Sequence, residues 1–331
     1  MTATLRERCI VGLLLLVTTG AFSIYALKEA PWRLRLGAFV AFALFFWPTL
    51  LLGTAEGREK LVAFVRRDDA LRRANVLALA FALTALVALS ALALDQFRWE
   101  AVGVGAAYLL IPTAALVLRR PNQEGLTLQD ALAIVALWFP IEFEWLPLAE
   151  LPKRPGIGLD KLVGVLWLLV LFLGVRRLEG VGYTFLLGRA DVARAGLYFA
   201  LFVTFFAIPL AIPTHFVASS PAMRPLSEIG LALVGTAFLI ALPEELLFRG
   251  VILNLLLRRW RAHPMRALAI ASLIFGFAHA NNSEEPTWVY VALATVAGWF
   301  YGLAYMKTGK VTTAALLHWM VNSYWGLFFH R

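Results

Sequence analysis

Long apolar stretches separated by short polar loops run along the whole chain. A helix that crosses the hydrocarbon core of a membrane needs about 20 mainly apolar residues. Eleven stretches approach that requirement: 10–27, 36–54, 74–94, 101–118, 131–148, 161–175, 195–216, 226–247, 267–280, 288–306 and 311–329. The pattern predicts an all-α protein, a polytopic transmembrane helical bundle of about 11 spans, with about 9–12 as the range.

The composition agrees with a membrane protein. The 331 residues are 61% hydrophobic and 15% charged, with a mean hydropathy of +0.76. Soluble domains are about 45–50% apolar and about 25% charged. The single cysteine, Cys9, excludes an intramolecular disulfide and a cysteine-based zinc site. The composition changes little along the chain, so no soluble domain is predicted.

Membrane topology explains the net charge of +9 better than a nucleic-acid partner does. With a cytoplasmic N-terminus, the inside loops carry 20 Lys and Arg residues and the outside loops carry 9, the bias that the positive-inside rule predicts. The run 10–27 is long enough to span and no convincing cleavage site follows it, which favours an uncleaved first helix over a signal peptide. The loop 56–73 has helical spacing, and the sequence leaves open whether that helix lies at the interface or in solvent.

Three charges stand inside the apolar stretch "IALPEELLFRGVILNLLL" (240–257). A charge at membrane depth is costly, and the usual reason to keep one is function. As a helix, this stretch places Glu244 roughly 20 Å inside the cytoplasmic boundary. Glu245 and Arg249 are four residues apart and share a face, so an ion pair is expected. Glu244 is offset from Glu245 by about 100°, which leaves it able to project into a cavity.

Two further polar pairs lie in late spans. "FGFAH" places Phe275 and His279 on one helix face, and "LLHWMVN" does the same for His318 and Asn322. Taken singly, such residues are more often helix–helix contacts than catalysts. Glu244, His279 and His318 are, however, predicted within one or two helical turns of the same depth on three helices, and that convergence favours a site. Glu142 and Glu144, two residues apart, cannot share a helix face and have no assigned role.

These residues resemble a known family. "PEELLFRG" (243–250), "FGFAH" (275–279) and "HWMVN" (318–322) are similar to the EExxxR, FxxxH and HxxxN/D motifs of the CPBP family, which groups CAAX-type prenyl proteases with Abi-related, bacteriocin-processing or immunity membrane proteins. "GWFYGLAYMKTGK" between the last two motifs adds to the resemblance. It covers about residues 195–330, so 191–331 is expected to be a protease core and 1–190 a transmembrane module of unknown role.

The resemblance implies an intramembrane endopeptidase. It implies that Glu244, with His279, activates the attacking water, that Glu245 and Arg249 form a supporting pair, and that His318 and Asn322 stabilise the oxyanion. The expected substrate is a membrane-associated peptide or a lipidated, CAAX-like protein. The expected location is a bacterial plasma membrane, where the lipid bilayer is the other partner. The oligomeric state is not predicted.

The sequence leaves the metal question open. Glu244, His279 and His318 form a plausible zinc set, but the HExxH pattern is absent, and the family is also viewed as metal-independent. No cofactor is therefore certain, and zinc is the candidate. Two other functions stay open: a non-catalytic bacteriocin-immunity or scaffold protein, and a proton-coupled transporter. No Walker motif, no intramembrane serine protease pattern and no pair of intramembrane Asp residues is present.

Overall fold

The computed structural model describes residues 3–26, 30–65, 72–118, 124–152, 157–216, 218–219, 225–281 and 287–330. Some basic residues counted in the loops lie outside this part of the chain: Lys28, Arg66, Arg67, Arg119, Arg120, Lys153, Arg154, Arg224 and Arg331. The chain divides into two compact units, Met1–Glu179 and Gly180–Arg331. Both are almost entirely helical, as the apolar pattern predicts.

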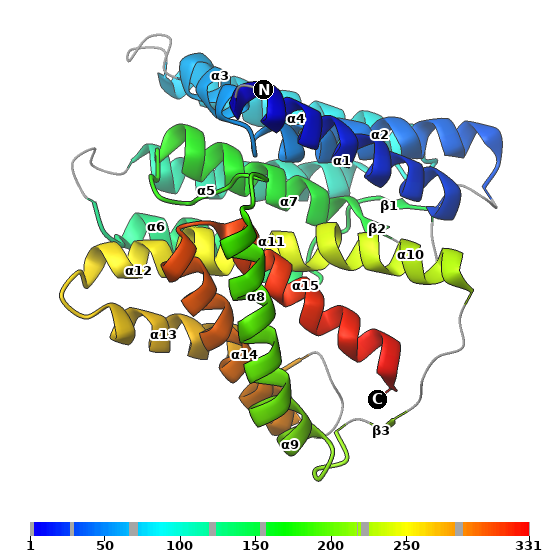
Figure 1. Ribbon diagram of the computed structural model, residues 1–331. Helices are drawn as coiled ribbons and strands as arrows, with labels where there is room; N and C mark the ends of the chain where they lie inside the picture. The colour runs from blue at the N-terminus through cyan, green and yellow to red at the C-terminus, as the bar shows by residue number, and fades with distance from the viewer. Residues whose placement is uncertain are drawn as a thin grey trace. The chain divides into compact units, whose positions relative to one another are not determined.

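The first unit contains the elements drawn from blue to green in Figure 1. They are α1 (Ala3–Ala26), α2 (Trp32–Leu51), α3 (Ala55–Val65), α4 (Arg72–Ala93), α5 (Trp99–Val117), α6 (Leu128–Glu142), β1 (Glu150–Leu151), β2 (Ile157–Gly158), α7 (Leu159–Leu169) and the π-helical turn η1 (Val170–Val175). β1 and β2 pair in the antiparallel sense. Helix α5 packs between α4 and α6, and α2 packs on α4 and α7.

A buried ion pair joins the first turn of α6 to the residue that follows η1. Arg176 Nε donates to Asp130 Oδ1 at 2.9 Å, and their side chains are 7% and 0% exposed. Asp130 also caps α6 together with Thr127. The indole of Trp167 donates to the Leu109 carbonyl at 2.9 Å. Buried polar groups are thus matched with partners, as a low-dielectric interior requires.

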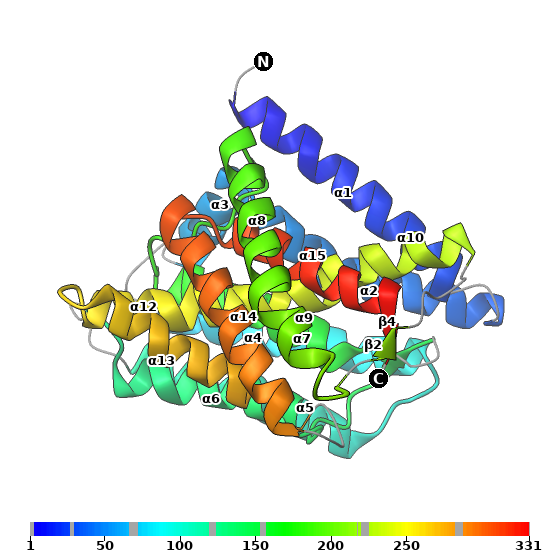
Figure 2. The ribbon, with the colours of Figure 1, turned by 60° about the horizontal axis from the view of Figure 1, so that its bottom comes forward.

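The second unit runs from green to red in Figure 1. It contains α8 (Arg189–Phe202), η2 (Val203–Ala207), α9 (Ile208–Ala211), β3 (Ala218–Ser219), α10 (Leu226–Gly235), η3 (Thr236–Ala241), α11 (Leu242–Glu245), η4 (Leu246–Leu253), α12 (Asn254–Arg259), α13 (Pro264–Phe277), α14 (Thr287–Thr308), α15 (Val311–Phe328) and β4 (Phe329–His330). β3 pairs with β4. Helix α14 packs on α13, α15 and α8, and its run beside α8 is visible in Figures 1 and 2.

One continuous helix of 34 residues, from Leu226 to Arg259, contains the acidic motif. It widens to π-helical turns at η3 and η4, and Pro243 stands between them. A proline has no N–H to donate and its ring clashes with the carbonyl four residues earlier. The same pattern recurs where η2 precedes Pro209. Proline therefore accounts for the widening, and π-helical turns are frequent at functional sites.

Small residues let α13 and α14 approach closely. A Cβ at Gly276 would overlap the Thr295 side chain, and one at Gly302 would overlap Leu268. Close approach of this kind is how membrane helices gain packing energy when lipid offers the same apolar surroundings. Because the motifs lie on α11–η4, α13 and α15, this packing positions the candidate site.

The predicted number of spans is wrong. Each of the eleven predicted stretches contains helix, but in the described part of the chain seven helices are long and apolar enough to cross a membrane: Thr4–Ile24, Trp32–Leu51, Arg73–Ala93, Trp99–Val117, Arg189–Ala211, Leu226–Arg259 and Trp288–Thr308. These seven still make the chain an integral, multi-pass membrane protein.

The four other predicted stretches form helices that are too short or too polar to count as membrane spans. α6 has 15 residues, α13 has 14, and α7 with η1 has 11 and 6. The apolar side chains of α7 and η1 are mostly buried within the protein, so their hydrophobicity reflects internal packing. Helix α15 has 18 residues, but polar residues such as His318 and Asn322 lower its hydropathy.

Candidate active site

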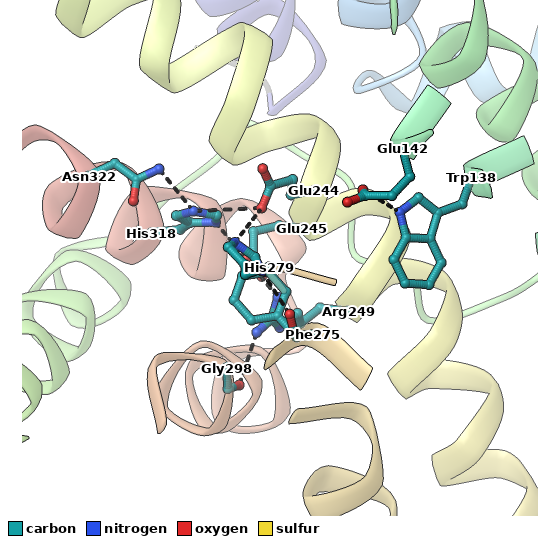
Figure 3. Close-up of polar contacts among 10 residues, drawn as sticks. All are labelled: Trp138, Glu142, Glu244, Glu245, Arg249, Phe275, His279, Gly298, His318 and Asn322. Carbon is teal, nitrogen blue, oxygen red and sulfur yellow. Dashed lines mark hydrogen bonds and ion pairs between the residues drawn. The ribbon is translucent and has the colours of Figure 1, made fainter. Parts of the chain in front are cut away.

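Three helices bring the predicted acidic and histidine residues together. Glu244 lies in the short α11 segment of the long helix, His279 follows the end of α13, and His318 lies in the middle of α15. Glu244 Oε2 is 3.9 Å from His279 Nε2 and 3.9 Å from His318 Nε2. Figure 3 shows both rings directed at this one carboxylate oxygen. The sequence predicts a similar membrane depth for these three residues, and in the structure their side chains meet.

Glu245 is buried beside Glu244 and binds two other residues of the site. Its Oε1 accepts from Arg249 Nη1 at 2.9 Å, which is the ion pair that the sequence predicts. The same oxygen lies 2.9 Å from His318 Nδ1, a contact that the sequence does not predict. The Glu245 side chain is 0% exposed, whereas that of Glu244 is 32% exposed. The two neighbouring glutamates therefore differ: Glu245 is internally bound, whereas Glu244 is partly exposed and its Oε2 is buried without a hydrogen-bond partner among the described residues.

Arg249 is fixed on every side. Nη2 donates to the Gly298 carbonyl at 3.0 Å, and Cζ lies 4.2 Å from the ring centre of Phe275 and 5.1 Å from that of Tyr301. Its side chain is 2% exposed. A guanidinium with charged, carbonyl and aromatic partners is the type of cation that tolerates burial. Arg249 thus holds the long helix, α13 and α14 in register around Glu245.

Hydrogen bonds define the protonation of the two imidazoles. His279 Nδ1 is 2.8 Å from the Phe275 carbonyl, which can only accept, so Nδ1 carries the hydrogen. Because a carboxylate accepts as well, His318 Nδ1 carries the hydrogen toward Glu245. Asn322 Nδ2 lies 3.1 Å from His318 Nε2. In both rings Nδ1 is anchored and Nε2 faces Glu244.

The distances decide what can stand between these groups. A separation of 3.9 Å is too long for a direct hydrogen bond. A water that donates to two acceptors at about 2.8 Å each holds them about 4.4 Å apart, given its bond angle. The Glu244–His279 gap is about 0.5 Å shorter than that value, so the two side chains have to move apart by about that distance for one water to donate to both.

The same residues do not fit a zinc ion as they are arranged. Tetrahedral zinc with bonds of about 2.0–2.1 Å holds its ligand atoms roughly 3.4 Å apart. Both Glu244–His distances exceed this value, and His318 Nε2 is engaged with Asn322. Among the described residues, no group of three or more His, Cys, Asp or Glu side chains is placed to hold a metal. No catalytic step is therefore derived through a metal.

Sequence reasoning missed the aromatic residues that shape the site and assigned no role to Gly298. Tyr301 stacks on the His318 ring with centroids 4.7 Å apart and an interplanar angle of 17°. Tyr290 contacts the His279 ring edge-to-face at 5.1 Å. Gly298, which the motif comparison includes, supplies its carbonyl to Arg249. The spacing of Gly298 and Tyr301 on one face of α14 was the available signal.

Glu142 and Glu144 belong to the first unit. Glu142 Oε2 accepts from the indole of Trp138 at 3.0 Å, also drawn in Figure 3. Glu144 has a positive φ of 53° directly after α6. Both therefore lie at the end of a helix, and Glu142 has a neutral partner.

Comparisons with known proteins point to the same segment. The family described as type II CAAX prenyl endopeptidase Rce1-like matches residues 226–324, which include all six candidate site residues. Comparison with curated proteins and with solved structures finds no match to this chain. The match to this type II CAAX prenyl endopeptidase family therefore covers a little under a third of the chain.

Proposed function

We propose that this protein is an intramembrane endopeptidase that hydrolyses a peptide bond in a membrane-associated or lipid-modified, CAAX-like protein or peptide. The observation that carries the proposal is the convergence of His279 and His318 on Glu244, the more exposed of the two adjacent motif glutamates, inside an Rce1-like segment. The proposed location of the protein is a bacterial plasma membrane, with the N-terminus in the cytoplasm.

In this mechanism Glu244 is the general base. A water between Glu244 and His279 donates one hydrogen to each, which turns an oxygen lone pair toward the scissile carbonyl. As the oxygen attacks the carbonyl carbon, its proton passes to Glu244 Oε2. The tetrahedral intermediate then collapses, the C–N bond breaks, and the proton passes from Glu244 or His279 to the leaving amine.

The oxyanion is stabilised from the opposite side by α15. His318 and Asn322 are neighbours on one face, and the amide of Asn322 supplies an N–H donor. A second proton, on Nε2, would make His318 an imidazolium that no longer accepts from Asn322, so the Nε2–H and the Asn322 N–H would both be free to donate to the oxyanion while Nδ1–H donates to Glu245. Glu245 is the positioning residue for this step, and Arg249 fixes Glu245.

Charge balance supports this arrangement. With neutral imidazoles the group of Glu244, Glu245 and Arg249 carries a net charge of −1. A net charge at membrane depth is costly. One additional proton on a histidine would cancel this net charge and supply an N–H donor for an oxyanion.

The test is cleavage of membrane-anchored peptides by the purified full-length protein in liposomes, followed by mass spectrometry. Each peptide is supplied with and without a C-terminal prenyl group. Glu244→Gln and His279→Ala should each lower the rate by about 10²–10⁴-fold. Glu228→Gln is the matched control, because it changes the same side chain on the same long helix, in the exposed first turn of α10.

Each outcome separates the candidate functions. Cleavage that persists in Glu244→Gln refutes the mechanism, and loss of cleavage in Glu228→Gln as well refutes the assignment of the base. A chelator that stops the reaction would show that a metal takes part. Peptide binding without cleavage by the wild type would favour the immunity or scaffold function, and proton-coupled flux without cleavage would favour a transporter.

A further inference from the structure

A basic pocket lies in the first unit, among residues that the proposed protease mechanism does not use. Its cavity of about 430 Å³ is lined by Ala55, Arg58, Glu59, Val62, Ala63 and Arg177. The first five lie on α3, and the last follows the end of η1. Two guanidinium groups from distant parts of the sequence therefore share one pocket with a single carboxylate.

Helix α3 is held firmly in place. Glu7 Oε2 accepts from the Ala55 N–H at 3.1 Å, and Arg8 pairs with Glu56 at 2.6 Å. Leu61 and Val65 pack against η1, close enough that a Cβ at Gly174 would lie 3.1 Å from Leu61. The pocket wall is therefore built from a fixed helix and not from a loose loop.

Both arginines are set in position by the backbone. Arg58 Nη1 donates to the Leu52 carbonyl at 3.2 Å. Arg177 has a left-handed backbone, with a φ of 52°, at the turn where the Leu178 N–H donates to the Phe172 carbonyl. Glycine is the usual residue at such a helix end. A long basic side chain here, exposed and lining the pocket, is an unusual choice that directs attention to a ligand.

The pocket lies directly beyond the end of a membrane span. Helix α2 ends at Leu51, and α3 begins four residues later. Phe64 on α3 is 50% exposed, which is suited to the apolar edge of the headgroup region. The positive-inside distribution predicts that this end of α2 faces the cytoplasm. Lipid headgroups are therefore the molecules that this pocket encounters most often.

We propose that this pocket binds the headgroup of an anionic, hydroxyl-bearing phospholipid such as phosphatidylglycerol. The planar forks of Arg58 and Arg177 suit two oxygens of the phosphate. The carboxylate of Glu59 repels a bare phosphate but accepts from the hydroxyls of the glycerol. Basic pockets beside membrane helices are known to hold anionic headgroups in this way.

Lipid binding to the full-length protein tests the proposal, with native mass spectrometry as the readout. The protein is titrated with phosphatidylglycerol, phosphatidylcholine or inorganic phosphate. The wild type should retain phosphatidylglycerol in preference to phosphatidylcholine. Arg58→Gln with Arg177→Asn should weaken that binding at least about tenfold, because charged hydrogen bonds to the phosphate are lost.

The variants are chosen so that a folding defect does not imitate the result. Asn tolerates the left-handed backbone at position 177, so Arg177→Asn keeps the turn. Lys60→Gln removes the same charge from the same helix, but Lys60 pairs with Glu56 at 2.7 Å and does not line the pocket. This control should bind within about twofold of wild type.

Three results would overturn the proposal. The first is equal retention of phosphatidylglycerol by the double variant and the wild type. The second is an equal loss in Lys60→Gln, which would show general surface charge. The third is inorganic phosphate that binds as tightly as the lipid and is lost in the same variants, which would identify a soluble anion as the ligand. None of these depends on peptidase activity.

Discussion

Removal of the Arg249 guanidinium is the sharpest test of how the candidate site is held together. In Arg249→Met the side chain keeps its approximate length but loses its charge. The Glu245 carboxylate, 0% exposed, then keeps His318 Nδ1 at 2.9 Å as its remaining partner at Oε1. The Gly298 carbonyl loses the donor that lay 3.0 Å away.

The structure sets the size of the effect. At 2.9 Å and an effective dielectric constant of 20, the Glu245–Arg249 attraction is about 6 kcal/mol before desolvation is subtracted. Measured losses for one partner of a buried pair are about 3–5 kcal/mol. Because His318 Nδ1 still donates to the Glu245 carboxylate, we expect a loss at the lower end, about 3 kcal/mol for Arg249→Met in the free energy of unfolding.

Two double variants turn this number into a test. Arg249→Met with Glu245→Gln removes both charges and should lie within about 1–2 kcal/mol of wild type, because no buried charge is left unpaired. Arg249→Met with His318→Gln removes both side chains that contact Glu245 Oε1 and should lose about 5 kcal/mol. The assay is equilibrium unfolding in mixed micelles, followed by circular dichroism. If the charge-free double variant is as unstable as Arg249→Met alone, the buried pair is not what stabilises the site.

The remaining predictions concern catalysis and packing. Asn322→Ala should lower the rate of peptide cleavage about 10²–10³-fold with little change in KM, because an oxyanion donor is lost. A steady-state rate equal to that of wild type would remove Asn322 from the mechanism. Gly298→Ala places a methyl group 3.2 Å from Arg249 Nη2 and should destabilise the protein by about 1–3 kcal/mol. Unfolding at the wild-type midpoint would show that the helices move apart without strain. Asp130→Ala leaves Arg176 buried without its carboxylate and should cost about 3–5 kcal/mol. A loss below about 1 kcal/mol in thermal unfolding would mean that water reaches this pair.

Local sequence determined the parts of the molecule that depend on one helix. The ion pair between Glu245 and Arg249 could be predicted because residues four apart meet on any helix. The approximate depth of Glu244, His279 and His318 followed from counting residues from the span ends. The proline at 243 marks where the long helix widens, and a helix through residue 257 was expected although the predicted span ended at 247.

The span count shows where apolar character alone misleads. A helix buried against protein and a helix facing lipid need the same kind of side chains. The apolar residues of the segment 159–175 are mostly buried inside the first unit, and the segment is too short to cross a membrane. Conversely, α15 carries the polar side chains of the candidate site and therefore has a low hydropathy.

Contacts between helices were decided by the tertiary structure. Only the docking and rotation of α15 against the long helix bring His318 Nδ1 to Glu245, and only the approach of α14 places Tyr301 on His318 and the Gly298 carbonyl on Arg249. These contacts join residues from 17 to 73 positions apart, and no local period encodes such distances. The sequence by itself determined which residues carry charge at membrane depth. The packing of small residues between helices decided that Glu244 stays accessible while Glu245 is bound, because it sets which face of each helix meets a neighbour.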